Sequence, residues 1–423
     1  MSTPSIKVGQ GNWGIKALNL LGYANTDKKF VARDFTVGRL LDTATRVNAS
    51  GNIEVVNANV PRIDYFGGQA SLLVEPSAVN GIRNNSMVGA SAPNTLPNNW
   101  SNAGSNLTRQ SVVTGTLNGI PYVDVRVSGT ANNAFHDIFW DASNIIAASV
   151  GQNWVASCYL QIIAQPNPPV NYVLAMREFS SGGTFLGVFQ GSALSISTTS
   201  FNRFSFTRAL NQATVAFVHP SLFFTLVNGQ TYDFTIRIGY PQMEQSSVAT
   251  SVIPTTTGSV TRNADAISVT GVAGLIGQTE GTIYVEVDYR NFSTETQVII
   301  QSLTDTQNRI AIQVFRSGGN NVLQAFAVVS NSQVVSITYT IPSAGVYKIA
   351  FAYKLNDYQL FVNSVDRGAD ITAGVPAMNT IQLGHFATVA QFNDRIRAVS
   401  IYQTRLPNTT TDGSPSLQSI TTL

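Results

Sequence analysis

Charged side chains are scarce in this chain of 423 residues, since Asp, Glu, Lys and Arg together make up 11% of it. Typical soluble domains contain about 25% of these residues. The apolar share is 43%, which is sufficient for sizeable cores, so Ser, Thr, Asn, Gln and Gly replace the missing charges. This composition favours a β-rich protein with broad, weakly charged surfaces over a metabolic enzyme.

The sequence also lacks any concentration of charge or apolarity that would indicate nucleic acid or a membrane as a partner. Its 25 basic and 23 acidic residues are spread along the chain, without a Lys/Arg run. No apolar stretch approaches the roughly 18 residues that span a bilayer, and the N-terminus MSTPSIKVGQ lacks a signal-peptide pattern. We therefore expect no nucleic acid, no membrane insertion and assembly in the cytoplasm of the producing cell.

Residues suited to metal or disulfide chemistry are equally few. Cys158 is the single cysteine, which excludes an internal disulfide and a cysteine zinc site, and its apolar surroundings predict a buried position. His136, His219 and His385 are far apart in sequence and have no carboxylate or cysteine at ligand spacing. We predict no cofactor and no metal site. Calcium held by scattered aspartates and backbone carbonyls remains open, as in many jelly rolls.

What the chain does contain is a long series of strand patterns. In Ile120–Val127, polar Tyr122, Asp124 and Arg126 alternate with valines, and similar runs recur about every ten residues up to residue 260. After a linker-like stretch the pattern resumes, with Ile283, Val285 and Val287 on one strand face. The chain is predicted to be all-β: a short, mostly irregular N-terminal attachment segment and then two consecutive β-sandwich or jelly-roll domains.

The predicted organisation has five parts. Residues 1–44 form an attachment segment, too small for its own core, which packs on the body or docks on a partner and has a short helix near Ile15–Leu21. An irregular connector (45–86) follows, in which Gly67 and Gly68 suit a tight turn, and we expect it to pack at the base of the first β-domain. Residues 87–260 form a jelly roll, 261–405 a second sandwich and 406–423 an extended tail.

One acidic pair invites an enzymatic interpretation. Glu286 and Asp288 have the spacing of the first two carboxylates of concanavalin-like β-glucanases, in which a second Glu follows three residues later. Here that position is Asn291, and an amide cannot act as a general acid in retaining glycoside hydrolysis. We predict that the protein is not an enzyme.

Aromatic rings are the side chains most suited to sugar binding, because exposed rings stack on pyranose faces. In the first β-domain the candidate carbohydrate-binding residues are Trp140, Trp154, Tyr172 and Phe185, with Phe189 beside them. The alternative for each is a core position, since β-sandwiches need large inward-facing aromatics.

Three stretches carry a family resemblance that covers most of residues 35–405. TRVNASGNIEVVNANVPRIDY, followed by SLLVEPSAVNGIRNNS, resembles the segment that precedes a jelly roll in bacteriophage and prophage structural proteins. YPQMEQSSVATSVIPTTTGSVTRNADAISV is similar to the end of their carbohydrate-binding-module-like domain. The run from Asn308 to Lys354, with a later QLGHF, looks like a concanavalin A-like (laminin G-type) sandwich. Ser77-Ala78-Val79-Asn80 departs from the family's usual Arg-Thr-Asn.

The resemblance implies a virion protein, either a tail or head fibre subunit or a spike, that contacts glycans on the host surface. It further implies a homotrimer attached to other virion proteins through the N-terminal segment. Two alternatives stay open: a purely structural capsid or tail decoration or adaptor protein, and a polysaccharide depolymerase.

Overall fold

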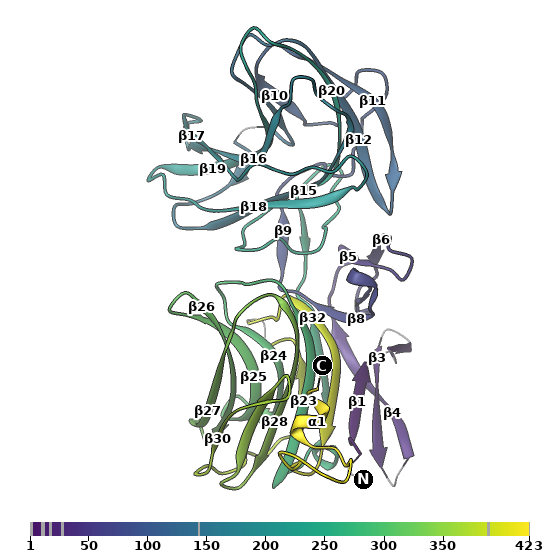
Figure 1. Cartoon of the computed structure of the whole chain (residues 1–423), viewed down its shortest axis with the longest axis vertical. Helices are drawn as coiled ribbons and strands as arrows, with labels where there is room; N and C mark the ends of the chain where they lie inside the picture. The colour runs from purple at the N-terminus through teal and green to yellow at the C-terminus, as the bar shows by residue number, and fades with distance from the viewer. Residues whose placement is uncertain are drawn as a thin grey trace.

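The computed structural model describes residues 3–9, 13–16, 19–26, 29–142, 144–386 and 390–422. Two all-β bodies are stacked along the long axis, and both chain ends lie in the lower one (Figure 1). Each body consists of antiparallel sheets facing one another across an apolar core. The prediction of an all-β chain with two β-sandwich domains is confirmed.

The lower body is a two-layered sandwich built mainly from the C-terminal third of the chain. As predicted, Ile283, Val285 and Val287 are buried between the layers. One layer contains β23 (Glu280–Tyr289), β28 (Gly345–Lys354), β29 (Tyr358–Val362), β30 (Val365–Asp370) and β32 (Asp394–Tyr402). The other contains β22 (Ala266–Thr270), β24 (Gln297–Asp305), β25 (Asn308–Ser317), β26 (Asn320–Val329), β27 (Ser332–Ile341) and β31 (Thr380–Leu383), and the 3-10 turn η2 is Ala273–Leu275.

Four N-terminal strands complete this sandwich: β1 (Ile6–Gly9), β2 (Gly14–Lys16), β3 (Asn19–Thr26) and β4 (Lys29–Gly38). β1 pairs with β32, β3 pairs with β1 and β4, and β4 continues into the opposite layer, where it pairs with β22. Their apolar side chains, which include Ile6, Leu20 and Phe35, are buried in the same core. The N-terminal strands therefore join the two layers.

This arrangement corrects the expectation of a mostly irregular, separate segment at residues 1–44. The predicted helix near Ile15–Leu21 is also wrong, because β2 and β3 occupy the described part of that stretch, with residues 17–18 outside the described residues. Of the two expected outcomes, packing on the body is the one observed. The cause is long-range pairing, since these residues bury their apolar side chains in a core built mainly by strands more than 200 residues away.

The upper body is a jelly roll of two facing sheets. Val123, Val125 and Val127 point into its core, as their alternation predicts, and Cys158 is buried there too. The first sheet contains β10 (Ser101–Gly104), β13 (Phe135–Phe139), β14 (Ile146–Ala147), β16 (Asn171–Ser180), β17 (Phe185–Gln190) and β19 (Val215–Thr225). The second contains β11 (Thr108–Leu117), β12 (Ile120–Thr130), β15 (Asn153–Ala164), β18 (Asn202–Ala209) and β20 (Thr231–Glu244).

The jelly roll is an insertion into the lower sandwich rather than the first of two consecutive domains. The chain leaves the lower body after β8 (Ser71–Val74), which pairs with β32, and returns to it at β22. The two connections, β9 (Ala78–Asn80) and β21 (Val260–Arg262), pair antiparallel with each other. Strands that precede the predicted boundary at residue 44 thus pair with strands that follow the predicted boundary at residue 260.

The connector bridges both bodies through the hairpin of β5 (Ala44–Val47) and β6 (Ile53–Val56), followed by β7 (Ile63–Asp64) and the 3-10 turn η1 (Phe66–Gly68). Thr45 Oγ1 donates to the Val252 carbonyl of the upper body at 2.6 Å. Arg395 of the lower body donates to Asp64 at 2.7 Å. Gly67 and Gly68 adopt the predicted positive φ angles, 75° and 83°, but are exposed, and their hairpin packs on the lower body.

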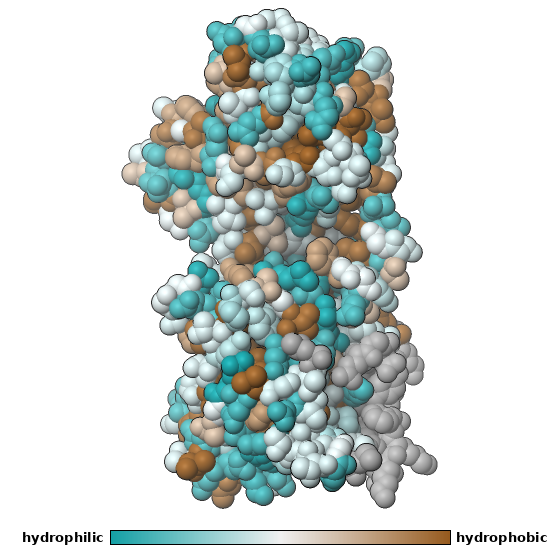
Figure 2. All heavy atoms as spheres, in the orientation of Figure 1, coloured by the Kyte–Doolittle hydropathy of each residue, from teal (hydrophilic) through white to brown (hydrophobic). Residues whose placement is uncertain are grey.

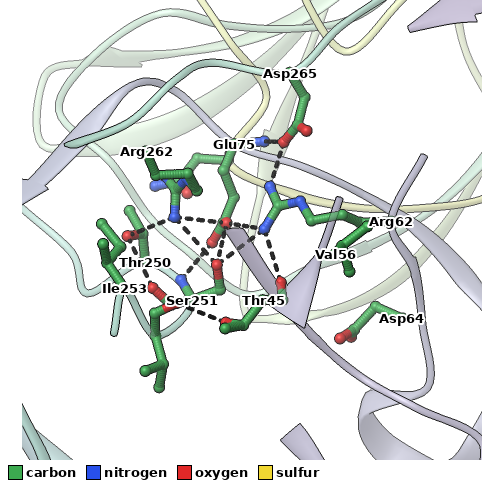
Figure 3. A network of polar contacts seen from close by, with 12 residues as sticks. Thr45, Val56, Arg62, Asp64, Glu75, Thr250, Ser251, Ile253, Arg262 and Asp265 are labelled. Atoms are coloured by element: carbon green, nitrogen blue, oxygen red, sulfur yellow. Dashed lines mark hydrogen bonds and ion pairs between the residues drawn. The ribbon is translucent and has the colours of Figure 1, made fainter. Parts of the chain in front are cut away.

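A network of buried ion pairs joins the connector to both interdomain connections (Figure 3). Arg62 of the connector donates to Glu75 Oε2 at 2.6 Å and forms a second ion pair with Asp265. Arg262, at the end of β21, lies 2.9 Å from the same Glu75 oxygen. Arg39 donates to the other Asp265 oxygen at 2.8 Å. All five of these side chains are buried. Water therefore cannot take the place of a partner if one of these ion pairs is broken.

Charge is balanced within this junction network. Glu244, also buried, accepts the Thr250 amide at 3.1 Å, so three carboxylates accompany the three guanidinium groups. Ser251 donates both its amide and its hydroxyl to Glu75 at 2.6 Å. Burial alone would raise the pKa of Glu75, but Arg262 and Arg62 hold it well below its usual range. The network fixes the outgoing and returning connections in one geometry.

The C-terminal tail covers the lower body instead of running as a simple extended segment. Leu406 and Leu417 are buried against Tyr284, Ala350 and Phe361 on the outer side of a sheet. A helical turn, α1 (Leu417–Ile420), begins after Ser416, whose side chain accepts the Ser419 amide. Burial of two leucines explains why the tail does not stay extended. Among the described residues no helix is long and apolar enough to cross a bilayer.

Removal of residues 1–38 is expected to unfold the lower body. The deletion takes five side chains from its core, Ile6, Val8, Leu20, Phe35 and Val37, each contributing about 1.5–3 kcal/mol. The sum approaches the whole stability of a typical domain. Calorimetry should show loss of one unfolding transition and persistence of the jelly-roll transition. Ile15→Ser, at an exposed position of the same segment, should leave both transitions in place. A truncated chain with both transitions would contradict the assignment of these strands to the core.

Substitution Glu75→Gln is expected to destabilise the chain by about 3–5 kcal/mol, because it leaves two buried guanidinium groups undercompensated. The matched control, Asp233→Asn, breaks the exposed Arg126–Asp233 pair and should cost less than about 1 kcal/mol. Chemical denaturation of the full chain measures both. Since the folded pKa of Glu75 is depressed from 4.5, its contribution is present above that pH and decreases as the pH falls below it. Equal effects of the two substitutions would show that the network does not hold the junction.

Candidate functional site

The outward side of the first jelly-roll sheet carries a cluster of phenylalanines, which we call the aromatic face. It comprises Phe135 and Phe139 on β13, Phe179 on β16, Phe185 on β17 and Phe223 on β19. The strand register places these residues on one side, since Phe223 lies opposite Asp137, and Phe179 opposite Phe185. Residues directly opposite each other in an antiparallel sheet share a face. Five residues distant in sequence thus form one surface.

Arg177 is the centre of the aromatic face. Its guanidinium carbon lies 5.5 Å from the centroid of Phe135, 5.3 Å from that of Phe139 and 5.3 Å from that of Phe185. These distances are within the range of cation–π attraction. Its Nε donates to the buried Asp137 carboxylate at 3.2 Å, and a second guanidinium nitrogen forms an ion pair with the same oxygen. Arg177 is therefore fixed in position by rings above the sheet and a carboxylate within it.

Asp137, Ser221 and His219 lie around this arginine, but they do not form a nucleophilic relay. Ser221 donates directly to Asp137 at 2.9 Å, and the Nε2–H of His219 donates to the Asp141 carbonyl at 2.6 Å. A Ser–His–Asp triad needs the histidine between the other two residues. Burial lowers the pKa of His219 to about 4, so its imidazole is neutral at pH 7. Its ring stacks on Phe139, with centroids 4.2 Å apart.

Access differs strongly across the aromatic face. The side chain of Phe185, on an edge strand, is 49% exposed, whereas Phe139 and Phe223 are buried and Arg177 retains 13% exposure. A ligand would therefore meet the Phe185 ring first, with the arginine behind it. A flat apolar ring beside a positively charged hydrogen-bond donor can stack on a sugar ring and bind one of its hydroxyl groups.

The other predicted carbohydrate-binding residues lie in or at the jelly-roll core. Trp140, Trp154 and Tyr172 are 0%, 6% and 4% exposed. For Trp140 and Tyr172 the reason is alternation, since each is one residue out of phase with the outward positions Phe139 and Val173. Phe189 is half-buried under the Arg208 guanidinium, 3.2 Å from the ring centroid. Of the four predicted carbohydrate-binding residues Trp140, Trp154, Tyr172 and Phe185, only Phe185 has an exposed ring.

The acidic pair on β23 is engaged by arginines. Asp288 is buried and accepts from Arg290 at 2.8 Å and from Arg397 at 3.0 Å. Glu286 lies 3.8 Å from Arg397, and Asn291 donates to the Asn393 carbonyl. These contacts explain the acidic residues as parts of an ion-pair cluster on the lower body. Within the described ranges, no three His, Cys, Asp or Glu side chains are grouped as metal ligands.

Sequence reasoning identified Phe185 but missed Arg177 and the other four phenylalanines of the aromatic face. The pattern Phe135-x-Asp137-x-Phe139 alternates with core residues and could have indicated an outward aromatic pair. The partners on β16, β17 and β19 become visible only through the pairing of strands distant in sequence.

Comparison with known proteins yields only weak likenesses. No family model matches the chain, and no curated protein resembles it significantly in sequence. Similar solved structures include domain 4 of AbnA, an extracellular GH43 arabinanase from Geobacillus stearothermophilus in complex with arabinotriose (15% identity, 37% of this chain and 73% of that one, TM-score 0.29). Others are domains LG4-5 of the mouse laminin alpha1 chain (9%, 60% and 83%, TM-score 0.25) and the CBM22 tandem of Paenibacillus barcinonensis Xyn10C (8%, 75% and 95%, TM-score 0.26). At these TM-scores the likenesses carry no functional argument.

Proposed function

We propose that the chain is a bacteriophage virion protein, a tail or head fibre subunit or spike, whose jelly roll contacts glycans on the host surface. The resemblance of the connector and of the returning connection to phage structural proteins supports the virion role. The jelly roll forms the upper body, whereas both termini lie in the lower one (Figure 1), and this position suits an outward-facing domain.

The observation that carries the glycan contact is the open Phe185 ring on the aromatic face. A pyranose presents C–H groups on its faces and hydroxyls on its rim, so it is recognised by an aromatic platform with polar neighbours. Phe185 supplies the platform and Arg177, 5.3 Å from its centroid, supplies the donor. The proposal requires no cofactor and no chemistry beyond binding, and calcium is not needed by this face.

The lower body is proposed as the base that meets other virion proteins. Because the N-terminal strands belong to its sandwich, attachment through the N-terminal segment would use the folded surface of this body. A homotrimer would form through the same body, and the protein would be located in the virion after assembly in the host cytoplasm.

A second candidate is a purely structural decoration or adaptor protein. The buried junction network favours it, since a rigid connection between two bodies serves spacing as well as display. A polysaccharide depolymerase has no comparable support, because Glu286 and Asp288 are both close to Arg397.

Substitution Phe185→Ala is expected to weaken binding to host surface polysaccharide about tenfold or more. Loss of a stacked ring removes on the order of 1.5–3 kcal/mol of apolar burial, and 1.4 kcal/mol corresponds to a tenfold change. Binding of the purified full chain to polysaccharide extracted from a panel of bacteria measures the effect. Phe66→Ala is the matched control, because Phe66 is 47% exposed and also lies beside arginines, Arg395 and Arg290.

Three outcomes of this experiment separate the candidates. Binding that is lost only in Phe185→Ala supports glycan contact through the aromatic face. Absence of binding by the unmodified chain across the panel favours the adaptor. Release of reducing sugars from the polysaccharide would establish the depolymerase. Light scattering should give three times the 45.3 kDa chain mass, and a monomer would count against the trimeric fibre.

A further inference from the structure

A polar groove of about 790 Å³ lies between the two bodies. Its upper wall comes from residues 151–153 and 245–247 of the jelly roll, and its lower wall from residues 293–297 and 390–393. Ser247 and Ser293 meet across it, with their hydroxyl oxygens 3.3 Å apart. In the space-filling view the molecule narrows between the bodies (Figure 2). The volume is within the range of small-molecule binding sites.

The groove is lined mostly by side chains with hydroxyl and amide groups, and Pro76, Ala78 and Ala390 lie among them. The polar side chains are Ser, Thr, Asn and Gln, and Glu295 is the one charged side chain among the described lining residues. Such groups offer both donors and acceptors without attracting a particular sign of charge. A ligand rich in hydroxyl groups would find many partners along this lining.

Asn393 is the member of the lining that most needs a partner. It is 3% exposed, and its Oδ1 has no hydrogen-bond partner among the described residues. Leaving a buried acceptor unpaired costs about 1–3 kcal/mol. The residue is held by its backbone, because its carbonyl accepts from Asn291 at 2.8 Å and its φ angle is 54°. The backbone from which this side chain extends is thus held in place.

An apolar hollow of about 600 Å³ continues the groove, since both are lined by Ser77, Ala78 and Gln245. Val79 and Ile145 contribute exposed apolar side chains to it, and Trp154 lines it as well. The combined surface is polar in one part and apolar in the other. Trp154, a predicted carbohydrate-binding residue, thus contributes to a cavity although most of its ring is buried.

We propose that this groove is a second binding site, for an uncharged oligosaccharide. A neutral sugar chain has this mixture of properties: hydroxyl groups for the Ser, Thr, Asn and Gln lining, a donor for Asn393 Oδ1, and C–H faces for the apolar hollow. The site is preformed, because the junction network fixes the connections on which its walls depend. Preformed sites lose less free energy to ordering on binding.

The experiment uses the full chain and a panel of neutral tri- and tetrasaccharides of glucose, galactose, mannose and N-acetylglucosamine. Array binding selects the sugar, and titration calorimetry measures its affinity. Thr294→Trp places a large side chain at the exposed rim of the polar groove, and Asn393→Gly removes the unpaired amide while tolerating the positive φ angle. Thr306→Trp, at an exposed turn outside the groove, is the matched control.

We expect at least a tenfold loss of affinity in Thr294→Trp and in Asn393→Gly, with Thr306→Trp unchanged and all melting temperatures similar. A panel without hits, or unchanged affinity in both groove variants, would overturn the inference. A change in oligomeric mass in Thr294→Trp without any sugar binding would also overturn it, by showing an interface between copies. Phe185→Ala should keep this affinity. If Phe185→Ala alone abolishes it, the sugar is on the aromatic face, and the proposed function stands without the groove.

Discussion

The buried ion-pair network at the junction is the interaction on which the arrangement of the two bodies depends. Three guanidinium groups and their carboxylates have been removed from water there, which is costly and is repaid only where geometry and hydrogen bonding are nearly complete. Apolar replacements of similar volume are often as stable as buried ion pairs, or more so. Charged partners instead discriminate between geometries, because a shifted connection would leave a buried ion unpaired. We interpret the network as a device for orientation.

This orientation matters because the jelly roll interrupts another domain. Two paired strands connect the bodies, and the lower sandwich closes only when strands from residues 6–38 meet strands from residues 266–402. The intervening jelly roll must therefore fold without separating these partners. A junction that fixes the outgoing and returning chain side by side shortens the effective loop that the lower body has to close. The entropic cost of closing a loop is smaller when the loop is shorter. The same contacts thus serve assembly and shape.

The sequence was sufficient for many strands of the two β-bodies, but not for β1–β3 and not for the pairing of strands. Alternation correctly placed Val123, Val125, Val127 and the Ile283–Val287 face, because alternation is a local property. It could not reveal that β4 joins both layers, or that residues 71–74 belong with β32, because those pairings depend on contacts far along the chain. The first two stretches that resemble phage structural proteins meet in space. Thr45, Arg62 and Glu75 come from the first stretch, and Arg262 and Asp265 come from the second. Their residue choices are explained by the junction and not by ligand chemistry.

The scarcity of charge also acquires a physical meaning. Much of the limited charge forms pairs inside the protein or against its sheets, at the junction, at Arg177–Asp137 and in the Asp288 cluster. The groove between the bodies is consequently lined by hydroxyl and amide groups, and most of the visible surface is hydrophilic or near neutral in hydropathy (Figure 2). Such surfaces discriminate little by charge, so selectivity must come from shape and hydrogen-bond geometry. Both depend on groove walls that keep their position, and the arginines of the junction network hold the connections on which these walls depend.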